Sequence, residues 1–196
     1  MASKSSEQTP QWKKRYPMKI GGGKQKGNAF ERECCKVLSF WWSGGKRDDV
    51  FYRTQSSGGR ATQRAKKGKT CSNHNGDVAA TDDEGLPFTR FVTVEIKRGY
   101  SGHSPYDHVD SAAMSHPSKF EEWCDQAKSD HQKAKTKGWL LITKRDRKRI
   151  MVFMPDKIAM HLDLGIQYDV KFPSLGVIGI DFETFFRRIS PKNFRA

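Results

Sequence analysis

The 196-residue sequence contains no apolar run that approaches the ~20 residues needed by a helix crossing a bilayer. It also has no stretch that resembles a signal peptide. Of its four cysteines, two are adjacent and two stand alone, so the even spacing of a disulfide framework is missing. These absences predict a soluble, intracellular (cytoplasmic) protein with no membrane partner.

Acidic side chains are also few compared with basic ones, at 22 against 36, which leaves a net charge of +14. The excess is uneven, because residues 1–27 and 46–69 each carry a net +6, whereas residues 70–120 carry a net −3. Clustered cations predict a polyanionic partner, above all nucleic acid, since each neutralised phosphate releases counterions. A basic surface that serves only solubility, or a tail for a membrane or an acidic protein, is the alternative.

The chain length suits a single domain with room for tails and insertions. Residues 1–27 are polar, basic and rich in glycine, which is typical of a disordered arm. The domain then runs over 28–196, with irregular insertions at about 55–76 and 99–117. Loops of this length in a compact domain are usually functional or disordered.

Hydrophobic periodicity and punctuation residues predict a mixed α/β fold. Asn28 and Glu31 form a possible capping box for a first helix that ends at 43–45, and Ser118 with Glu121 forms another for a helix ending near Gly138. The expected strands are 49–54, 77–81, 90–97, 139–143 and 150–154, with weaker ones near 168–172 and 176–180; shorter helices are expected at 156–164 and 181–189.

The strand "RFVTVEIK" interrupts its apolar run with Glu95 and Lys97. Residues two apart share a face, about 7 Å from each other, so Phe91, Thr93, Glu95 and Lys97 should point one way and Val92, Val94 and Ile96 the other. If 77–81 and 90–97 form a hairpin centred on Leu86, Asp77 lies opposite Glu95. This pairing would bring two carboxylates together.

Two facing carboxylates repel each other unless a cation sits between them. Mg²⁺ prefers oxygen ligands and is often held by one or two carboxylates together with substrate phosphate. Lys97 on the same face could orient a water or stabilise charge on a phosphodiester undergoing hydrolysis. The alternative is a surface salt bridge between Glu95 and Lys97 at a fraying strand, with Asp77 as a turn residue.

The order Glu31, Asp77, Glu95-Ile96-Lys97 resembles the PD-(D/E)xK nuclease superfamily, whose restriction-endonuclease-like core is a helix, a three-stranded mixed sheet, a helix and a strand. Within it, the chain is most similar to archaeal-type Holliday-junction resolvases. The matching segments are "KGNAFERE" (26–33), "RTQSSG" (53–58), "GDV" (76–78) and "EIK" (95–97). The resemblance covers about 26–143, and Gly76 stands where the superfamily's name has proline.

The resemblance implies a role for each matching residue. Asp77, Glu95 and the backbone carbonyl of Ile96 would bind Mg²⁺, with Mn²⁺ as a substitute, and Glu31 would bind it directly or through water. Lys97 would be the catalytic lysine. Arg53 and Ser57 would contact DNA near the scissile phosphate, and Gln126 resembles a glutamine found near such sites.

These observations predict a Mg²⁺-dependent endodeoxyribonuclease, most like a Holliday-junction resolvase. Two symmetric cuts would require a homodimer, and the arm and insertions would suit a phage enzyme. Phosphate contacts are expected from the arm, the turn 144–149 and the 55–69 loop, which carries Arg60, Lys66, Lys67 and Lys69. The alternatives are a nuclease of the same fold acting on duplex, nicked or DNA-end substrates, and a non-catalytic nucleic-acid-binding protein.

Zinc is a weaker possibility for the same chain. Cys71 and His74 have a C-x-x-H spacing, but no clear second pair follows, and a closed structural site needs four ligands.

Overall fold

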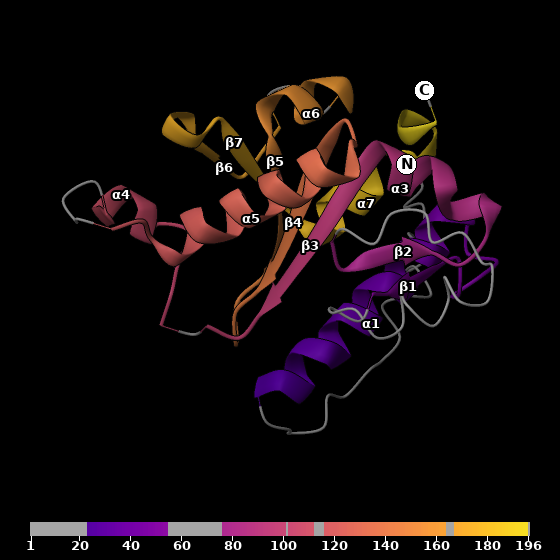
Figure 1. The fold of residues 1–196 in the computed structure, drawn as a ribbon, viewed down its shortest axis with the longest axis horizontal. Coiled ribbons are helices and arrows are strands. Elements are labelled where there is room, and N and C mark those ends of the chain that lie inside the picture. The colour runs from indigo at the N-terminus through magenta and orange to yellow at the C-terminus, as the bar shows by residue number, and fades with distance from the viewer. Residues whose placement is uncertain (1–22, 55–75, 101, 112–115, 164–166, 196) are drawn as a thin grey trace, which may run out of the picture.

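The computed structural model describes residues 23–54, 76–100, 102–111, 116–163 and 167–195. It is a mixed α/β structure built around a five-stranded sheet in the order β3-β4-β5-β7-β6 (Figure 1). The five strands are β3 (Val92–Arg98), β4 (Gly138–Lys144), β5 (Ile150–Pro155), β6 (Val170–Phe172) and β7 (Val177–Asp181). No helix within the described ranges is long and apolar enough to cross a membrane.

Strands β3 and β4 run parallel, and the other neighbours in this sheet are antiparallel. A second, two-stranded sheet pairs β1 (Phe51–Arg53) with β2 (Val78–Ala80). The parallel pair is joined through α4 (Asp107–Ser111) and α5 (Lys119–Ala134), as expected for a crossover that must return to the same end of the sheet. The first of these helices lies in the insertion 99–117, which was expected to be irregular.

Two apolar cores cover the two faces of the five-stranded sheet. One face packs against α1 (Gly23–Trp42), α3 (Leu86–Phe91), α6 (Asp156–His161) and α7 (Phe182–Arg188). The other face packs against α5, which lies across β3 and β4 in Figure 1. Because the side chains of a strand alternate, each central strand contributes to both cores.

The predicted alternation of the third strand is confirmed from Val92 onward. Val92, Val94 and Ile96 lie in the core with α1, whereas Thr93 hydrogen-bonds to Thr136 just beyond α5. The prediction was wrong for Phe91, which belongs to α3 and packs in the core with α1.

The predicted hairpin between 77–81 and 90–97 is wrong. The segment between them folds as a 3₁₀ turn at Asp83–Gly85 followed by α3, with Pro87 in the first turn, where its missing N–H costs nothing. Strand β2 consequently pairs with β1, and β3 pairs with β4. The chain therefore brings Asp77 to β3 by a different contact.

The first helix begins at Gly23, so the prediction that Asn28 is its N-cap is wrong. The Asn28 side chain instead accepts a hydrogen bond from Arg53 Nη2 on β1, at 2.9 Å. The predicted end of the helix is confirmed, since Gly44 and Gly45 follow Trp42 with positive φ.

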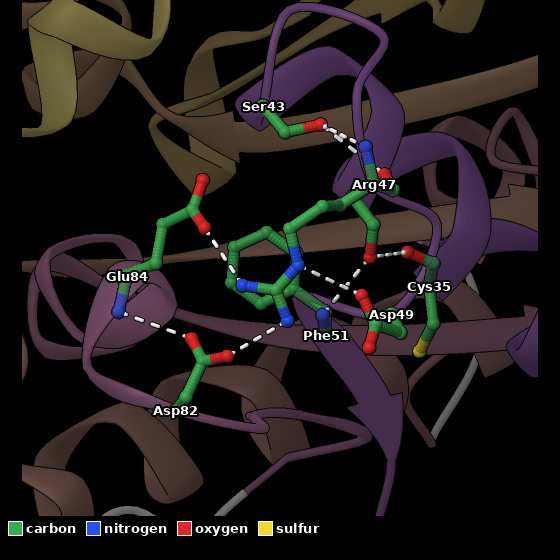
Figure 2. Close-up of polar contacts among 8 residues, drawn as sticks. Cys35, Ser43, Arg47, Asp49, Phe51, Asp82 and Glu84 are labelled. Atoms are coloured by element: carbon green, nitrogen blue, oxygen red, sulfur yellow. Dashed lines mark hydrogen bonds and ion pairs between the residues drawn. The ribbon is translucent and has the colours of Figure 1, made fainter.

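Arg47 fixes the segment after α1 to the loop that follows β2 (Figure 2). Its guanidinium group donates to Asp49, Asp82 and Glu84 at 2.7–2.9 Å, and these hydrogen bonds hold the Arg47 pKa above its ordinary value. Trp42 Nε1 donates to the Glu84 carbonyl at 2.8 Å. These contacts hold α1, β1 and the 3₁₀ turn together and so set the position of the small sheet.

The capping box predicted at Ser118 is confirmed. Ser118 Oγ accepts from the Glu121 N–H, and Glu121 Oε2 accepts from the Ser118 N–H at 2.7 Å. The cap fixes the first turn of α5, which covers the sheet face opposite α1.

We expect Ser118→Ala to lower the free energy of unfolding by about 1 kcal/mol, because the substitution leaves an amide of the first turn without a partner. Ser118→Asp keeps an acceptor at the same position and serves as the matched control. Chemical denaturation of the three proteins measures the difference, and equal midpoints for Ser118→Ala and the wild type would contradict the prediction.

Candidate functional site

Asp77 docks on the open edge of β3 through two hydrogen bonds on either side of Glu95. The Asp77 N–H donates to the Val94 carbonyl at 2.7 Å, and its Oδ2 accepts from the Ile96 N–H at 2.7 Å. Among the described strands, β3 is the outermost of its sheet, so none of them pairs with these groups on that side. The contact places the Asp77 carboxylate beside Glu95, which lies between Val94 and Ile96 in β3.

Gly76 makes this docking possible. Its φ is +97°, and a Cβ atom built there would lie 2.7 Å from Thr93 Cγ2 and 2.8 Å from the Val94 carbonyl oxygen. A side chain at position 76 would therefore push the Asp77 segment away from β3. The Gly76 carbonyl is also fixed, since it accepts from Thr54 Oγ1 at 2.5 Å.

We expect Gly76→Ala to destabilise the protein by more than the ~1–3 kcal/mol of backbone strain alone. Gly99→Ala is the matched control, because Gly99 has a φ of +96° and no atom within 4 Å of the added Cβ. The difference in the free energy of unfolding between the two variants measures the steric conflict with β3. Equal losses in the two variants would mean that Gly76 supplies only its backbone conformation.

Glu95 and Lys97 lie on the face of β3 that α5 covers. Lys97 Nζ donates to Glu95 Oε1 at 2.5 Å and to Gln126 Oε1 on α5 at 3.0 Å. Glu95 is only 2% exposed, which rules out a salt bridge on the surface of a fraying strand. Gln126, named from the sequence, therefore holds the lysine in place.

Burial and mutual repulsion make the two carboxylates costly to ionise together. Burial and the nearby Glu95 raise the pKa of Asp77 from 3.8 to about 7, against the lowering effect of the Ile96 N–H. Burial raises the pKa of Glu95 as well, although Lys97 opposes the shift. Such a pair is stabilised by a cation placed between its members.

The donor set fits a hard divalent cation. Glu95 Oε2 is buried and accepts no hydrogen bond from the described residues, so one carboxylate oxygen is available as a ligand. Across the described residues, no three His, Cys, Asp or Glu side chains converge as a possible metal cluster. Two carboxylates alone suit Mg²⁺, which keeps several waters and also binds substrate phosphate.

Glu31 lies on α1 and forms an ion pair with Arg53 of β1. Its charge raises the pKa values of Asp77 and Glu95, so it lies within electrostatic reach of both. The structure thus brings together Asp77, Glu95 and Lys97, while Glu31 acts on the two carboxylates through its charge. Arg53 joins them through Glu31 and Asn28.

Sequence reasoning missed Asp130, whose charge raises the pKa of Glu95. It lies on α5 four residues after Gln126, and residues at this spacing share a helix face. The signal that could have found Asp130 is its position one turn after Gln126 on the same face of α5.

Several predicted residues lie outside the described ranges. These are Cys71 and His74 of the zinc hypothesis and five expected DNA contacts: Ser57, Arg60, Lys66, Lys67 and Lys69. Cys34, Cys35 and Cys124 are free and buried. Burial raises the pKa of the Cys35 and Cys124 thiols to about 12.

Without metal, the raised Asp77 pKa should make stability fall with rising pH. Folded Asp77 titrates near 7 and the unfolded group near 3.8, so the stabilising contribution of the protonated form is lost as pH rises to about 7. Asp77→Asn removes this loss. Its advantage over the wild type should grow between pH 4 and 7 and reach about 4 kcal/mol at pH 8, since the pKa rises from 3.8 to about 7 and one pKa unit corresponds to about 1.4 kcal/mol.

Denaturation in EDTA across this pH range measures the advantage. Asp146→Asn, in an exposed turn, is the control and should show no such trend. Saturating Mg²⁺ at pH 8 should stabilise the wild type more than Asp77→Asn. A difference between wild type and Asp77→Asn that does not change with pH would contradict the prediction.

Comparison with known proteins returned one family match. A family model described as "Phage putative PDDEXK endonuclease" matches residues 22–194. A search of curated proteins and a search of solved structures returned no match.

Proposed function

Because the chain belongs to the phage PD-(D/E)xK endonuclease family, we propose that it is a metal-dependent endodeoxyribonuclease that cuts branched DNA as a Holliday-junction resolvase. Its active residues are Asp77, Glu95 and Lys97. Asp77, Glu95 and the Ile96 carbonyl hold the cation and Glu31 binds it through water; the cation is Mg²⁺ or, as a substitute, Mn²⁺.

One observation carries the catalytic part of the proposal. Glu95 is buried at the open edge of β3, the half-buried Asp77 is hydrogen-bonded to the next residue of that strand, and Glu95 Oε2 lacks a partner in the described structure. A fold gains no stability from two repelling carboxylates that are withdrawn from solvent, so a ligand is the physical reason to keep them. A divalent cation is the ligand that satisfies both.

Phosphodiester hydrolysis joins a water oxygen to phosphorus, breaks one phosphorus–oxygen ester bond, and protonates the departing oxygen. When bound, the cation supplies a Lewis acid that neutralises charge on the phosphodiester. Lys97 Nζ, held by Glu95 and Gln126, donates hydrogen bonds toward the water or the developing charge on the phosphate. Its two partners keep the ammonium group aimed at the metal-binding side chains.

DNA reaches this site from the end of the sheet where β3 stops. The basic turn 144–149 lies at that end, because Arg98 of β3 is in register with Lys144 of β4. Cations there attract the phosphate backbone without reading its sequence. The predicted phosphate contacts from this turn therefore suit a strand that passes Lys97.

Preference for a four-way junction rests on the four sequence segments shared with resolvases, from "KGNAFERE" to "EIK". Resolving a junction takes one cut in each of two strands related by symmetry. A homodimer supplies two sites with that relation, and a two-fold axis is the commonest symmetry of soluble oligomers.

We expect the wild type to cut DNA only with Mg²⁺ or Mn²⁺. Asp77→Asn and Glu95→Gln should abolish cutting, and Lys97→Met should slow it at least 100-fold, because a charge-stabilising donor is lost. Asp83→Asn, an exposed acid outside the site, is the matched control. Unchanged rates in the Asp77 and Glu95 variants, with folding verified by circular dichroism, would refute the catalytic assignment.

The same assay should compare a four-way junction, a Y-fork, a nicked duplex, a plain duplex and a single strand. Paired symmetric nicks confined to the junction are the result expected of a resolvase. Equal cutting of the plain duplex would instead identify an endonuclease without junction specificity.

A further inference from the structure

A cavity of about 190 Å³ lies on the same sheet face as Glu95 and Lys97. Its walls come from three strands, from the basic turn 144–149 and from the segment just before α4. The residues that characterise it are Tyr106, Thr143, Arg145, Lys148, Arg149 and Phe172.

The sheet register joins this cavity to the candidate active site. Lys97 of β3 is the neighbour of Thr143 on β4, and Thr143 is the neighbour of Met151 on β5. Both Thr143 and Met151 line the cavity. Because neighbouring strands are about 4.8 Å apart and β6 is the fourth strand from β3, the cavity begins one strand from Lys97, and its Phe172 wall lies about 19 Å away.

The lining combines aromatic and cationic groups. Tyr106 is 60% exposed at the cavity, and its ring lies 6.2 Å from that of the buried Phe172. Among the described residues, no carboxylate pairs with Arg145, Lys148 or Arg149. An exposed aromatic ring beside unpaired cations suits a ligand with a planar ring and a negative charge.

The size of the cavity and one further side chain restrict the kinds of ligand that can bind there. The volume lies below the ~300 Å³ at which pockets for drug-sized molecules begin, so only one ring system fits. Asp169 also lines the cavity, and its Oδ2 accepts from the Asp181 N–H at 2.6 Å. This carboxylate disfavours a phosphate beside it, whereas an amino group on a base edge would be a suitable donor to it.

We propose that this cavity binds one unpaired nucleotide of the strand being cut, with its base against Tyr106 and Phe172 and its phosphate at the basic turn. The assignment rests on the proposed nuclease function. A distance of about 19 Å corresponds to about six nucleotides at ~3.4 Å per step, so the bound nucleotide lies within about six steps of the scissile phosphate. An unpaired base is present in the single-stranded arms of a fork and not inside a duplex, so the cavity favours branched substrates whose strands separate near the branch.

Binding can be measured separately from cutting in a Lys97→Met background, which leaves Asp77 and Glu95 in place with Mg²⁺. A Y-fork carries 2-aminopurine at each unpaired position in turn, and stacking on Tyr106 should quench its fluorescence at one position near the branch. An abasic residue at that position should weaken binding about 5- to 150-fold, because base–aromatic stacking contributes about 1–3 kcal/mol.

Tyr106→Ala in the same background should remove most of this abasic penalty, to within about 2-fold. Tyr168→Ala is the matched control, since Tyr168 is also exposed but does not line the cavity. A second variant, Arg149→Gln, should reduce the slope of log K against log salt by about 0.7–0.9, whereas Lys157→Gln on α6 should leave it unchanged. Thermal melting verifies that each variant is folded.

The outcomes separate the cavity from the nuclease. If the abasic penalty depends on Tyr106, the cavity assignment is supported even when the wild type cuts no DNA. Failure to cut DNA would refute only the proposed function. The cavity assignment is overturned if the abasic penalty is equal in Tyr106→Ala, or if no position shows a penalty. Metal-dependent cutting in the same experiment would leave the nuclease assignment intact.

Discussion

The candidate site depends on the docking of Asp77 against the free edge of β3. Its main-chain N–H and its carboxylate bind Val94 and Ile96, so the intervening Glu95 is held beside it. These bonds also satisfy backbone groups that an edge strand would otherwise leave without partners. One contact thus pairs backbone groups at the edge of the sheet and holds the two carboxylates next to each other.

This arrangement works against stability in the absence of a ligand. Burial raises the pKa values of both carboxylates, and their repulsion adds to the cost of ionising them. Lys97 compensates Glu95 in part, but Glu95 Oε2 remains without a partner in the described structure. Local conflict of this kind is expected at functional sites, where binding a ligand recovers the cost.

The parallel pairing of β3 and β4 places the chemistry and the basic groups at one end of the sheet. In that register, Lys97 and Arg98 lie beside Thr143 and Lys144, next to the turn 144–149. The other core, around α1 and α7, occupies the opposite face. The face with Glu95 and Lys97 also carries an apolar core, around α5, so both faces stabilise the sheet and one of them also holds the candidate site.

Much of this was predictable from local sequence. The period-two pattern of β3 identified which residues enter the core, and the Ser118 capping box located the start of α5. The order of Glu31, Asp77, Glu95 and Lys97 indicated the family, which the match over 22–194 confirms. Local patterns sufficed here because alternation, capping and motif order depend on near neighbours in the chain.

The way Asp77 reaches β3 was not predictable, and the expected hairpin was wrong. A turn-rich segment after 81 was compatible with a tight connection, yet it folds as a 3₁₀ turn and a helix that pack on the core. Likewise, only the fold places Arg53 on Glu31 and Asp130 near Glu95. The sequence determined which residues are candidates for the site; tertiary packing decided how they meet, because the contacts that join them link segments far apart in the chain.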